Sequence, residues 1–503
     1  MNPLTLGIDV GTTTTKAVLA DVEGKLFADA AKSYTYSKPC PDWVEQNPED
    51  WWDAVCHTIR ELLRQHPDAR QRIAAIGVSG QGVASVLIDA QGRPLRPAIL
   101  WLDSRSAPQS DELNRRCGER IAALSGKSPA PYNVEPKLLW VRQNEPEIWR
   151  RTSKNLTTTG YVTFRLTGRA VMNHSDAGIC LAYDLARLAW SEELAELIGI
   201  TTSIYCELAA CHQVIGSVTP EAAEASGLPA GTPVIAGGED TSSAGLAMGV
   251  TSPDTAQLSM GSASTVYVPL SRAVTDPRLL AFPHVVQGLT LVGGSMVGGG
   301  TAMDWTAAVL GGEDGRASKE QLQSLTQGAA EVHPGSDGLI FLPYLAGELQ
   351  PINDGFARGV FFGLDLSKTR GHMVRAVLEG TAFAIRQNLE ITRDLGANTQ
   401  KLVAVGGPTR NKLWCQIIAD VTGLPVEVMH ERGGAALGDA ILAALGVGLI
   451  TSARSMQQAH AQVIDGFTPD SRYAARYAEL FAIYQELYPR LKDLFPRLAA
   501  CSR

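Results

Sequence analysis

Residues 4–21 read LTLGIDVGTTTTKAVLAD, and this stretch sets the frame for the rest of the chain. Leu4–Val10 and Thr15–Asp21 are short runs rich in apolar and β-branched residues, which predicts two β-strands. Gly11 and the threonines that follow it predict a tight turn between them. A third run of the same kind covers Lys25–Tyr34. We therefore expect the chain to open with three antiparallel strands.

Beyond these strands, helical and strand patterns alternate. Apolar residues recur every three or four positions over Pro48–Arg64, which predicts a helix, and Ile73–Val78 predicts a buried strand. A similar order returns later, with expected strands at Thr255–Met260, Thr265–Leu270 and Gln287–Val292, an expected helix near Ala302–Leu310, and a final helical stretch, Ser471–Leu498, that packs back on the body. This weak duplication predicts a mixed α/β protein of two related domains that join near Gly249.

The composition narrows the classes of protein to consider. Of the 503 residues, 45% are hydrophobic and 19% are charged, which excludes a disordered chain. The net charge of −8 gives no reason to expect nucleic acid or an anionic membrane as a partner. The eight cysteines form no CxxC pair, so no zinc site is expected. With no signal-peptide pattern and no membrane-length apolar run, the sequence predicts a cytoplasmic protein. It leaves the oligomeric state open, with a homodimer as one option.

The turn at residues 9–16 carries the first chemical signal. Consecutive backbone N–H groups and threonine hydroxyls, with Lys16 close by, can form a cradle for an anion. Asp9, at the end of the first strand, is placed to reach a metal ion that bridges phosphates. The alternative is a plain hairpin with exposed threonines.

Acidic residues follow a second glycine-containing turn. The expected strand Thr232–Ala236 ends at Gly237-Gly238, and Glu239-Asp240 then begins an expected helix. Asp240 is therefore either a catalytic carboxylate or a helix N-cap. No GxxxxGK[ST] motif is present, so a P-loop nucleotide site is not supported. Two further glycine turns stand at Gly261-Ser262-Ala263-Ser264 and at Gly406-Gly407-Pro408-Thr409-Arg410-Asn411.

In combination these motifs resemble the FGGY family of carbohydrate kinases over nearly the whole chain. Gly359–Leu364, seven further residues and then His372–Gly380 match the family's second signature without a mismatch. Tyr132–Gln143 matches the first signature only in part, because Val134 stands where a small residue or proline is usual. A third segment, Asn173–Ala177 followed by Tyr183-Asp184 and Trp190, also resembles the family, with Asn173 in place of the usual aspartate.

The resemblance implies two RNase H-like α/β domains, as in actin, hexokinase and heat-shock chaperone ATPases, with a cleft between them. Residues 1–249 would bind mainly the sugar, and residues 250–503 mainly the nucleotide. Asp9 would hold Mg²⁺, and Asp240 would be the catalytic base. The remaining implied residues are Gln81, Gly82, Asp103, Arg105 and Thr241 for the sugar, and Thr12, Thr13, Thr14, Lys16, Gly261, Ser262, Gly406, Gly407 and Asn411 for ATP. Trp305 either borders the nucleotide or lies in the core.

The resemblance also bears on the substrate. Family members that phosphorylate xylulose carry a Met-His pair after Ser-Gly-Gln, whereas this chain has Gly82-Val83 there. The segment Pro41–Gln46, together with Asp103 and Arg105, still resembles those members. D-xylulose, giving D-xylulose 5-phosphate, is therefore the first expectation. Another pentulose, a polyol such as erythritol, and gluconate stay open, because one missing buried hydrogen-bonding group can change specificity strongly.

A different class of function uses the same ATPase core. Actin-like filament proteins and heat-shock chaperones bind ATP without phosphorylating a sugar. The expected polar pocket of Gln81, Asp103, Arg105 and Asp240 favours the kinase, because neither a filament protein nor a chaperone needs one.

Overall fold

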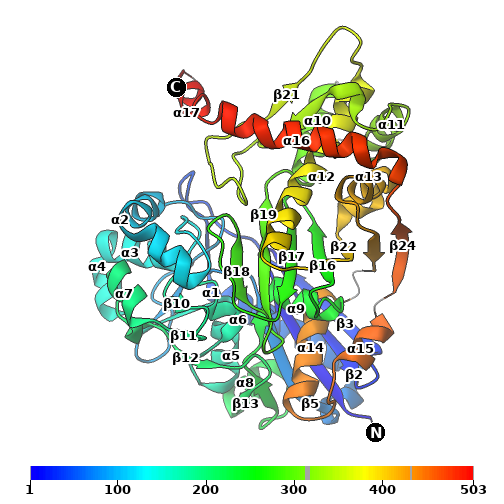
Figure 1. The fold of residues 1–503 in the computed structure, drawn as a ribbon. Coiled ribbons are helices and arrows are strands. Elements are labelled where there is room, and N and C mark those ends of the chain that lie inside the picture. The colour runs from blue at the N-terminus through cyan, green and yellow to red at the C-terminus, as the bar shows by residue number, and fades with distance from the viewer. Residues whose placement is uncertain (1, 312–317, 431–432, 461, 502–503) are drawn as a thin grey trace. The chain divides into compact units, whose positions relative to one another are not determined.

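The computed structural model describes residues 2–311, 318–430, 433–460 and 462–501 (Figure 1). The chain divides into two compact units. Unit 1 comprises residues 1–251, 270–291 and 432–462, and unit 2 comprises residues 252–269, 292–431 and 463–503. The chain first crosses from unit 1 to unit 2 after Thr251, close to the expected domain boundary at Gly249. The observed division differs from the expected one, 1–249 and 250–503, because two later segments return to unit 1.

Unit 1 is built on a mixed sheet whose centre is the opening stretch of the chain. β1 pairs antiparallel with β2, β2 pairs antiparallel with β3, and β1 pairs parallel with β5 on its other side. The expected three-stranded opening is therefore confirmed. The order is β13 (Val214–Ser217), β14 (Pro233–Ile235), β5 (Ile73–Gly80), β1 (Leu4–Val10), β2 (Thr14–Asp21) and β3 (Leu26–Ser33), and the short β15 (Gly238–Glu239) also pairs with β5.

One helix of unit 1 comes from far along the chain and explains the returning segment. Helix α14 (Gly434–Gly446) packs directly on β1 and β5. A Cβ atom at Gly7 would lie 1.8 Å from the Ala436 carbonyl oxygen, and one at Gly77 would lie 2.2 Å from the Asp439 carbonyl oxygen. No larger residue fits at either strand position, so the glycines let the helix backbone rest on the sheet. This contact places residues 432–462 in unit 1.

The expected first helix of unit 1 is confirmed as α1 (Pro48–Gln65), which packs on β2 and β3. Asn47 caps it, and its buried face includes Trp51, Val55 and Ile59. The other elements of unit 1 that matter below are α3 (Val134–Asn144), α5 (Thr158–Thr167), α6 (His174–Ala177), α8 (Pro220–Ser226) and α9 (Asp240–Ala247).

Unit 2 repeats the central strand arrangement of unit 1. β16 pairs antiparallel with β17 and parallel with β22, as β1 does with β2 and β5. The neighbouring strands run in the order β19 (Thr290–Met296), β17 (Ser264–Leu270), β16 (Thr255–Met260), β22 (Lys401–Val405), β23 (Val426–Met429) and β24 (Val463–Phe467). The expected duplication of topology is therefore present.

β19 begins later than the expected strand, Gln287–Val292, and extends beyond it to Met296. A Cβ atom at Gly293 would lie 1.9 Å from the Val266 carbonyl oxygen on β17. Glycine is therefore needed inside this strand because a neighbouring backbone lies so close. The expected helix near Ala302–Leu310 is confirmed as α10 (Gly300–Gly311).

The last helical stretch packs on unit 2, as expected, but it is not continuous. α16 (Ala474–Leu491) contacts α12 (Arg370–Asp394) and α13 (Lys412–Thr422), and a separate helix, α17 (Phe495–Cys501), follows. Figure 1 shows both helices in red. Among the described residues, no helix has the length and apolar character needed to cross a membrane.

Candidate active site

Hydrogen bonds within the turn between β1 and β2, and with two residues outside it, fix its conformation. The Gly11 amide donates to the Thr14 carbonyl oxygen at 3.1 Å. Asp9 and Lys16 lie opposite each other in the backbone register of the hairpin. Trp101 Nε1 donates to Thr12 Oγ1 at 3.1 Å, and Thr14 Oγ1 lies 3.3 Å from Ser33 Oγ. Thr13 and Lys16 are exposed. The structure therefore brings the expected phosphate-binding residues to one turn, with the hydroxyls of Thr12 and Thr14 already oriented.

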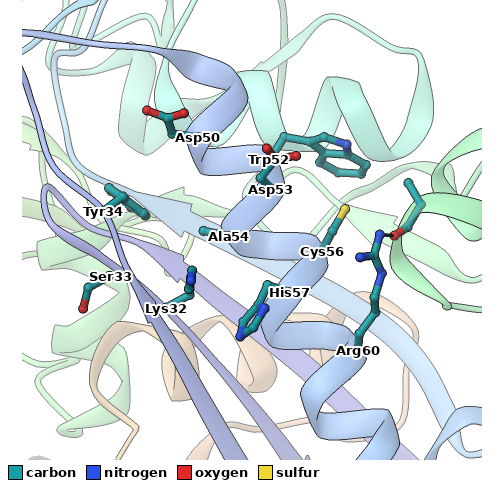
Figure 2. Close-up of a pocket in the computed structure, with 11 residues that line it drawn as sticks. Lys32, Ser33, Tyr34, Asp50, Trp52, Asp53, Ala54, Cys56, His57 and Arg60 are labelled. Carbon is teal, nitrogen blue, oxygen red and sulfur yellow. Dashed lines mark hydrogen bonds between the residues drawn. The ribbon is translucent and has the colours of Figure 1, made fainter.

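Tyr34 donates two hydrogen bonds to the backbone of this turn. The Tyr34 amide donates to the Thr13 carbonyl oxygen at 3.0 Å, and Tyr34 Oη donates to the Gly11 carbonyl oxygen at 2.6 Å. Tyr34 also lines a surface pocket of about 420 Å³ between β3 and α1. Figure 2 shows Lys32, Ser33 and Tyr34 on one side of this pocket and His57 and other residues of α1 on the other. The lining includes none of the expected substrate or nucleotide residues.

The strand ends beside this turn bring together carboxyl groups that are distant in sequence. Asp9 on β1 pairs in register with Ser79 on β5, and Ser79 Oγ lies 3.4 Å from Asp9 Oδ1. Below them, Asp439 on α14 accepts a hydrogen bond from Ser243 Oγ at 2.8 Å. Burial raises the pKa of Asp439 well above its ordinary value, and the charges of Asp9 and Asp240 raise it further.

Asp240 occupies the first turn of α9, but it does not cap the helix. The cap is Glu239, whose Oε2 accepts a hydrogen bond from the Ser242 amide at 2.9 Å. Asp240 Oδ1 instead accepts from the Thr241 amide at 2.6 Å, and its carboxylate stays half-buried. The capping alternative for Asp240 is thereby removed, because the neighbouring glutamate does that work.

Glycine makes the approach to Asp240 sterically possible. Gly237 has a φ of +78°, and a Cβ atom there would lie 1.9 Å from the Val78 carbonyl oxygen. Gly238 then pairs with Ser79 on β5, which aligns the next two residues with the ends of β1 and β5. The expected sharp exit after the glycine pair is therefore present.

Two more buried carboxyl groups lie near Asp240. Burial raises the pKa of Asp176, on α6, to about 7, and the charge of Asp240 contributes to the rise. Burial also raises the pKa of Glu239 well above its ordinary value, and Asp240 again adds to the effect. Asp176, Glu239 and Asp439 are thus stabilised in their protonated forms beside the less buried Asp240.

Gln81 has a buried acceptor that no protein group satisfies. Its backbone amide donates to the Val10 carbonyl oxygen at 2.9 Å, and its Nε2 donates to Gln46 Oε1 at 3.1 Å. Its Oε1 is buried and has no hydrogen-bond partner among the described residues. Gln46 also donates to the Thr12 carbonyl oxygen at 2.9 Å, which joins this amide to the phosphate turn. An orphaned buried acceptor is costly unless a ligand donates to it, which supports the expected sugar-binding role of Gln81.

The backbone after Gln81 is strained and held by a buried lysine. Val83 has a φ of +52°, which is unfavourable for a β-branched residue. Lys137 Nζ donates to the Val83 carbonyl oxygen at 2.7 Å, and burial lowers the pKa of Lys137 to about 7. Lys137 belongs to the partly matched signature, and the structure gives it this anchoring contact.

Asp103 and Arg105 are adjacent and buried, and they bind mainly each other. Asp103 Oδ2 accepts from Arg105 Nη2 at 2.7 Å and from the Val44 amide at 2.6 Å. Arg105 Nη1 also lies 2.7 Å from Glu45 Oε1, and the guanidinium stacks over Trp43 at 3.9 Å. The structure therefore uses the two expected sugar-binding residues to fix the loop that carries Trp101.

In unit 2, the expected nucleotide residues lie on two neighbouring turns. Gly261 and Ser262 form the exposed turn between β16 and β17, and their carbonyl oxygens accept from the amides of Gly300 and Thr301 at 2.8 and 3.0 Å. Gly406 follows β22 with a φ of +105°, and a Cβ atom there would lie 1.9 Å from the Met260 carbonyl oxygen.

Asn411 and Trp305 complete the expected nucleotide set. Asn411 caps α13, accepting from the Trp414 amide at 3.2 Å, and its Nδ2 donates to Thr326 Oγ1 at 3.1 Å. Trp305 lies on α10 and is 37% exposed, so the core alternative is not the observed placement. Gly407 is also exposed, with open space at its missing Cβ.

Sequence reasoning missed Asp439 and Asp176 as site residues. The available signal for Asp439 was a lone acid in the apolar helical run Gly434–Gly446. The signal for Asp176 was its place inside the third family-like segment. The described residues contain no group of three or more His, Cys, Asp or Glu side chains arranged to hold a metal ion.

Comparison with known proteins identifies the family and the fold of the chain. Residues 4–247 match the N-terminal domain, and residues 256–447 the C-terminal domain, of the FGGY family of carbohydrate kinases. The xylulose kinase of Bacillus subtilis is 30% identical over 95% of both chains. The structure of xylulose kinase from Rhodospirillum rubrum superposes with a TM-score of 0.93 at 35% identity, over 98% of this chain and 99% of that one. Gluconate kinase from Lactobacillus acidophilus gives 0.93 at 27% identity, over 99% and 100%. The chain is a sugar kinase with the actin- and hexokinase-like ATPase fold, and it belongs to the FGGY family of carbohydrate kinases.

Proposed function

We propose that this chain transfers the γ-phosphoryl group of ATP to D-xylulose, giving D-xylulose 5-phosphate, with Asp240 as the base. The observation that carries the proposal is the state of Asp240, a half-buried carboxylate held by Thr241 and not needed for capping. A carboxylate at hydrogen-bond distance accepts or orients the proton of a sugar hydroxyl while the new bond to phosphorus forms. The ATP-dependent reaction also leads us to assign the protein to the cytoplasm.

The residues at the end of β1 fit Mg²⁺. Mg²⁺ prefers oxygen ligands and usually keeps several waters, bound by one or two carboxylates together with substrate phosphates. Asp9 supplies such a carboxylate, with Ser79 Oγ beside it at 3.4 Å. We assign Asp9 to Mg²⁺, directly or through water. The ion would neutralise the charge that develops on the phosphate oxygens.

The remaining groups bind and orient. In unit 1, we assign the hydroxyls and amides of Thr12, Thr13 and Thr14, with Lys16, to the phosphates of ATP. In unit 2, the exposed turn at Gly261-Ser262 and the open backbone at Gly407 suit close approach by a nucleotide. We assign the Gln81 Oε1 acceptor to a sugar hydroxyl.

The negative charge of Asp240 favours a neutral substrate over gluconate. The charge of Asp240 raises the pKa of three other carboxyl groups, those of Asp176, Glu239 and Asp439. Arg105, the cation expected in the sugar pocket, forms ion pairs with Asp103 and Glu45. A carboxylate substrate would therefore add negative charge beside an acidic group without gaining a counter-ion. Similarity to gluconate kinase keeps gluconate as the second candidate.

A coupled assay of ADP release tests the substrate directly. D-xylulose, D-ribulose, erythritol and D-gluconate would be compared at saturating Mg-ATP. We expect the highest kcat/KM for D-xylulose and the lowest for gluconate. A preference for gluconate would overturn the electrostatic argument, and ADP release with none of the four substrates would overturn the pentulose assignment.

A further inference from the structure

Glu239 is a buried acid that the proposed reaction does not yet use. Only 7% of the residue is exposed. Its Oε2 accepts from the Ser242 amide at 2.9 Å, which fixes one end of the carboxyl group. Its register position on β15, opposite Gly80, places it beside the loop that carries Gln81 and Gly82.

The carboxyl group of Glu239 also interacts with Asp240 and lies close to Gly82. The side chains of Glu239 and Asp240 are within hydrogen-bonding reach, and this contact helps to raise the pKa of Glu239. A Cβ atom at Gly82 would lie 3.0 Å from Ile179 Cδ1, 3.5 Å from Glu239 Cγ and 3.6 Å from Glu239 Oε1. Alanine would thus meet Glu239 in ordinary contact, whereas the longer side chain of a methionine would have to displace it. The bare backbone at Gly82 leaves room for Glu239.

The burial of the two residues gives the contact a direction. Glu239 is the more buried of the two, so the shared proton belongs to Glu239, because burial disfavours the charged form. A protonated carboxyl group has one O–H donor, and a carboxylate such as Asp240 only accepts. Glu239 therefore donates to Asp240, which fixes the orientation of that carboxylate while leaving it charged. The same arrangement fails if Glu239 loses its proton, because two adjacent carboxylates repel each other.

We propose that Glu239 is a positioning residue that orients Asp240 through a donated hydrogen bond, and that a small residue at position 82 leaves space for the Glu239 side chain. This inference rests on the proposed role of Asp240. It predicts that Glu239 acts on kcat through Asp240, with little effect on the binding of ATP.

Substitution of Glu239 separates positioning from capping. Glu239→Ala removes both the donor and the cap, whereas Glu239→Gln keeps the size and can still donate through its amide. We expect Glu239→Ala to lower kcat about 10–100-fold, as is usual when a group that orients a reacting residue is lost. Glu239→Gln should retain clearly more turnover than Glu239→Ala.

The matched control removes another cap in the same unit. Thr219 caps α8, accepting from the Ala222 amide at 3.2 Å. Thr219→Ala should lower Tm as Glu239→Ala does, but leave kcat unchanged. If the Glu239→Ala variant loses only stability and keeps parental kcat, Glu239 is merely a cap and the inference is wrong.

The pH profile of kcat supplies a readout that capping does not move. Since burial and Asp240 raise the pKa of Glu239, the parent should lose activity on the alkaline side as Glu239 deprotonates. Glu239→Gln cannot titrate, so this part of the alkaline loss should disappear. Asp176 and Asp439, which also interact with Asp240, and Lys137, which holds Val83, are present in both proteins and cancel in the comparison. Identical profiles would contradict the inference.

The space at Gly82 is tested by a double-mutant cycle. Gly82→Met should lower kcat by displacing Glu239, and Gly82→Ala should do so much less. In the Glu239→Ala background, Gly82→Met should cost clearly less, because only Ile179 remains to be displaced. Fully additive losses would contradict the coupling.

Asp240→Asn distinguishes a failure of the proposed base, Asp240, from a failure of the proposed role of Glu239. Parental turnover in Asp240→Asn would remove the proposed base, and with it the basis for a positioning role. Severe loss in Asp240→Asn, with parental turnover in Glu239→Ala, would leave the proposed function intact and reject only the Glu239 inference.

Discussion

Two strand-to-helix junctions, one in each unit, share the same backbone geometry. In unit 1, Gly237 has a φ of +78° and its missing Cβ would lie 1.9 Å from the Val78 carbonyl oxygen. In unit 2, Gly406 has a φ of +105° and its missing Cβ would lie 1.9 Å from the Met260 carbonyl oxygen. Both glycines follow a strand and lie directly against the neighbouring strand of their sheet. The repeated topology therefore extends to the detail of how the chain leaves the sheet.

The residues that follow the two glycines make the difference. The unit 1 junction continues with Glu239 and Asp240, beside Asp439, whereas the unit 2 junction continues with an exposed glycine and the neutral cap Asn411. The first junction can hold a proton and a base, and the second offers open backbone to a ligand. The backbone geometry therefore comes with the fold, whereas a few side chains give each of the two junctions its chemistry.

Asp240→Asn is expected to have the largest effect on activity. It changes the unit 1 junction, where Glu239 and Asp240 follow the two glycines. The variant keeps the size of the side chain and removes the proton acceptor. Loss of a general base typically costs about 10²–10⁴-fold, and we expect a fall in kcat of that order. Sugar and ATP affinities should change only modestly, as isothermal titration would show.

The melting temperature of the same variant tests the division of labour within this junction. Because Glu239 rather than Asp240 caps α9, we expect Tm to stay close to that of the parent. A variant with near-parental kcat and a clearly lowered Tm would reverse the assignment.

Asp9→Ala is expected to have the next largest effect. Removing one carboxylate from a Mg²⁺ site with few protein ligands should lower Mg-dependent turnover about 10–100-fold. Sugar affinity should be nearly unchanged, because the Asp9 carboxylate lies beside Ser79 at the start of the phosphate turn. Titration of activity with Mg²⁺ should show a higher requirement in the variant. A collapse of sugar affinity with an unaltered Mg²⁺ requirement would refute this assignment.

Much of this comparison could be predicted from the sequence. Local patterns identified β1, β2 and β3, the glycine junctions and the acids after Gly237, because strand propensity and glycine turns depend on neighbouring residues. The duplication was visible for the same reason. These features need no knowledge of distant contacts.

The contacts made by side chains from distant segments could not be predicted. Asp439 reaches Ser243 across 196 residues of chain, through a helix that packs on Gly7 and Gly77. Asp103 and Arg105 also bind the Val44 amide and Glu45, two contacts that the sequence pattern did not indicate. The exchange of roles between Glu239 and Asp240 depends on one residue of helix register, which sequence patterns do not resolve.

Asp176→Asn tests how the acidic surroundings of the first junction affect stability. The folded-state pKa of Asp176 is raised to about 7, so the folded protein holds this proton more tightly than the unfolded chain does. That contribution is fully present below the unfolded pKa of about 4 and is lost as pH rises through about 7. Relative to the variant, the parent should therefore lose stability between these two pH values.

Denaturant unfolding of both proteins across this range measures the difference. Because the charge of Asp240 contributes to the raised pKa, the pH dependence should weaken when both proteins also carry Asp240→Asn. A difference in unfolding free energy that stays constant with pH would show that Asp176 does not titrate in this window.

Asn411→Ala, at the neutral junction, should give the smallest effect and one of a different kind. Asn411 Oδ1 accepts from the Trp414 amide and Nδ2 donates to Thr326, so both ends of the side chain are already bound within unit 2. Loss of an N-cap costs about 1 kcal/mol, and we expect a drop in unfolding free energy of that size. Asn411→Ser, which can still cap, should recover most of it. The KM for ATP should change little in either variant, because the backbone rather than this side chain is left to meet the nucleotide. A large rise in KM for ATP in both variants, with parental stability in Asn411→Ser, would instead place the Asn411 side chain in contact with ATP and make the two junctions chemically more alike than their sequences indicate.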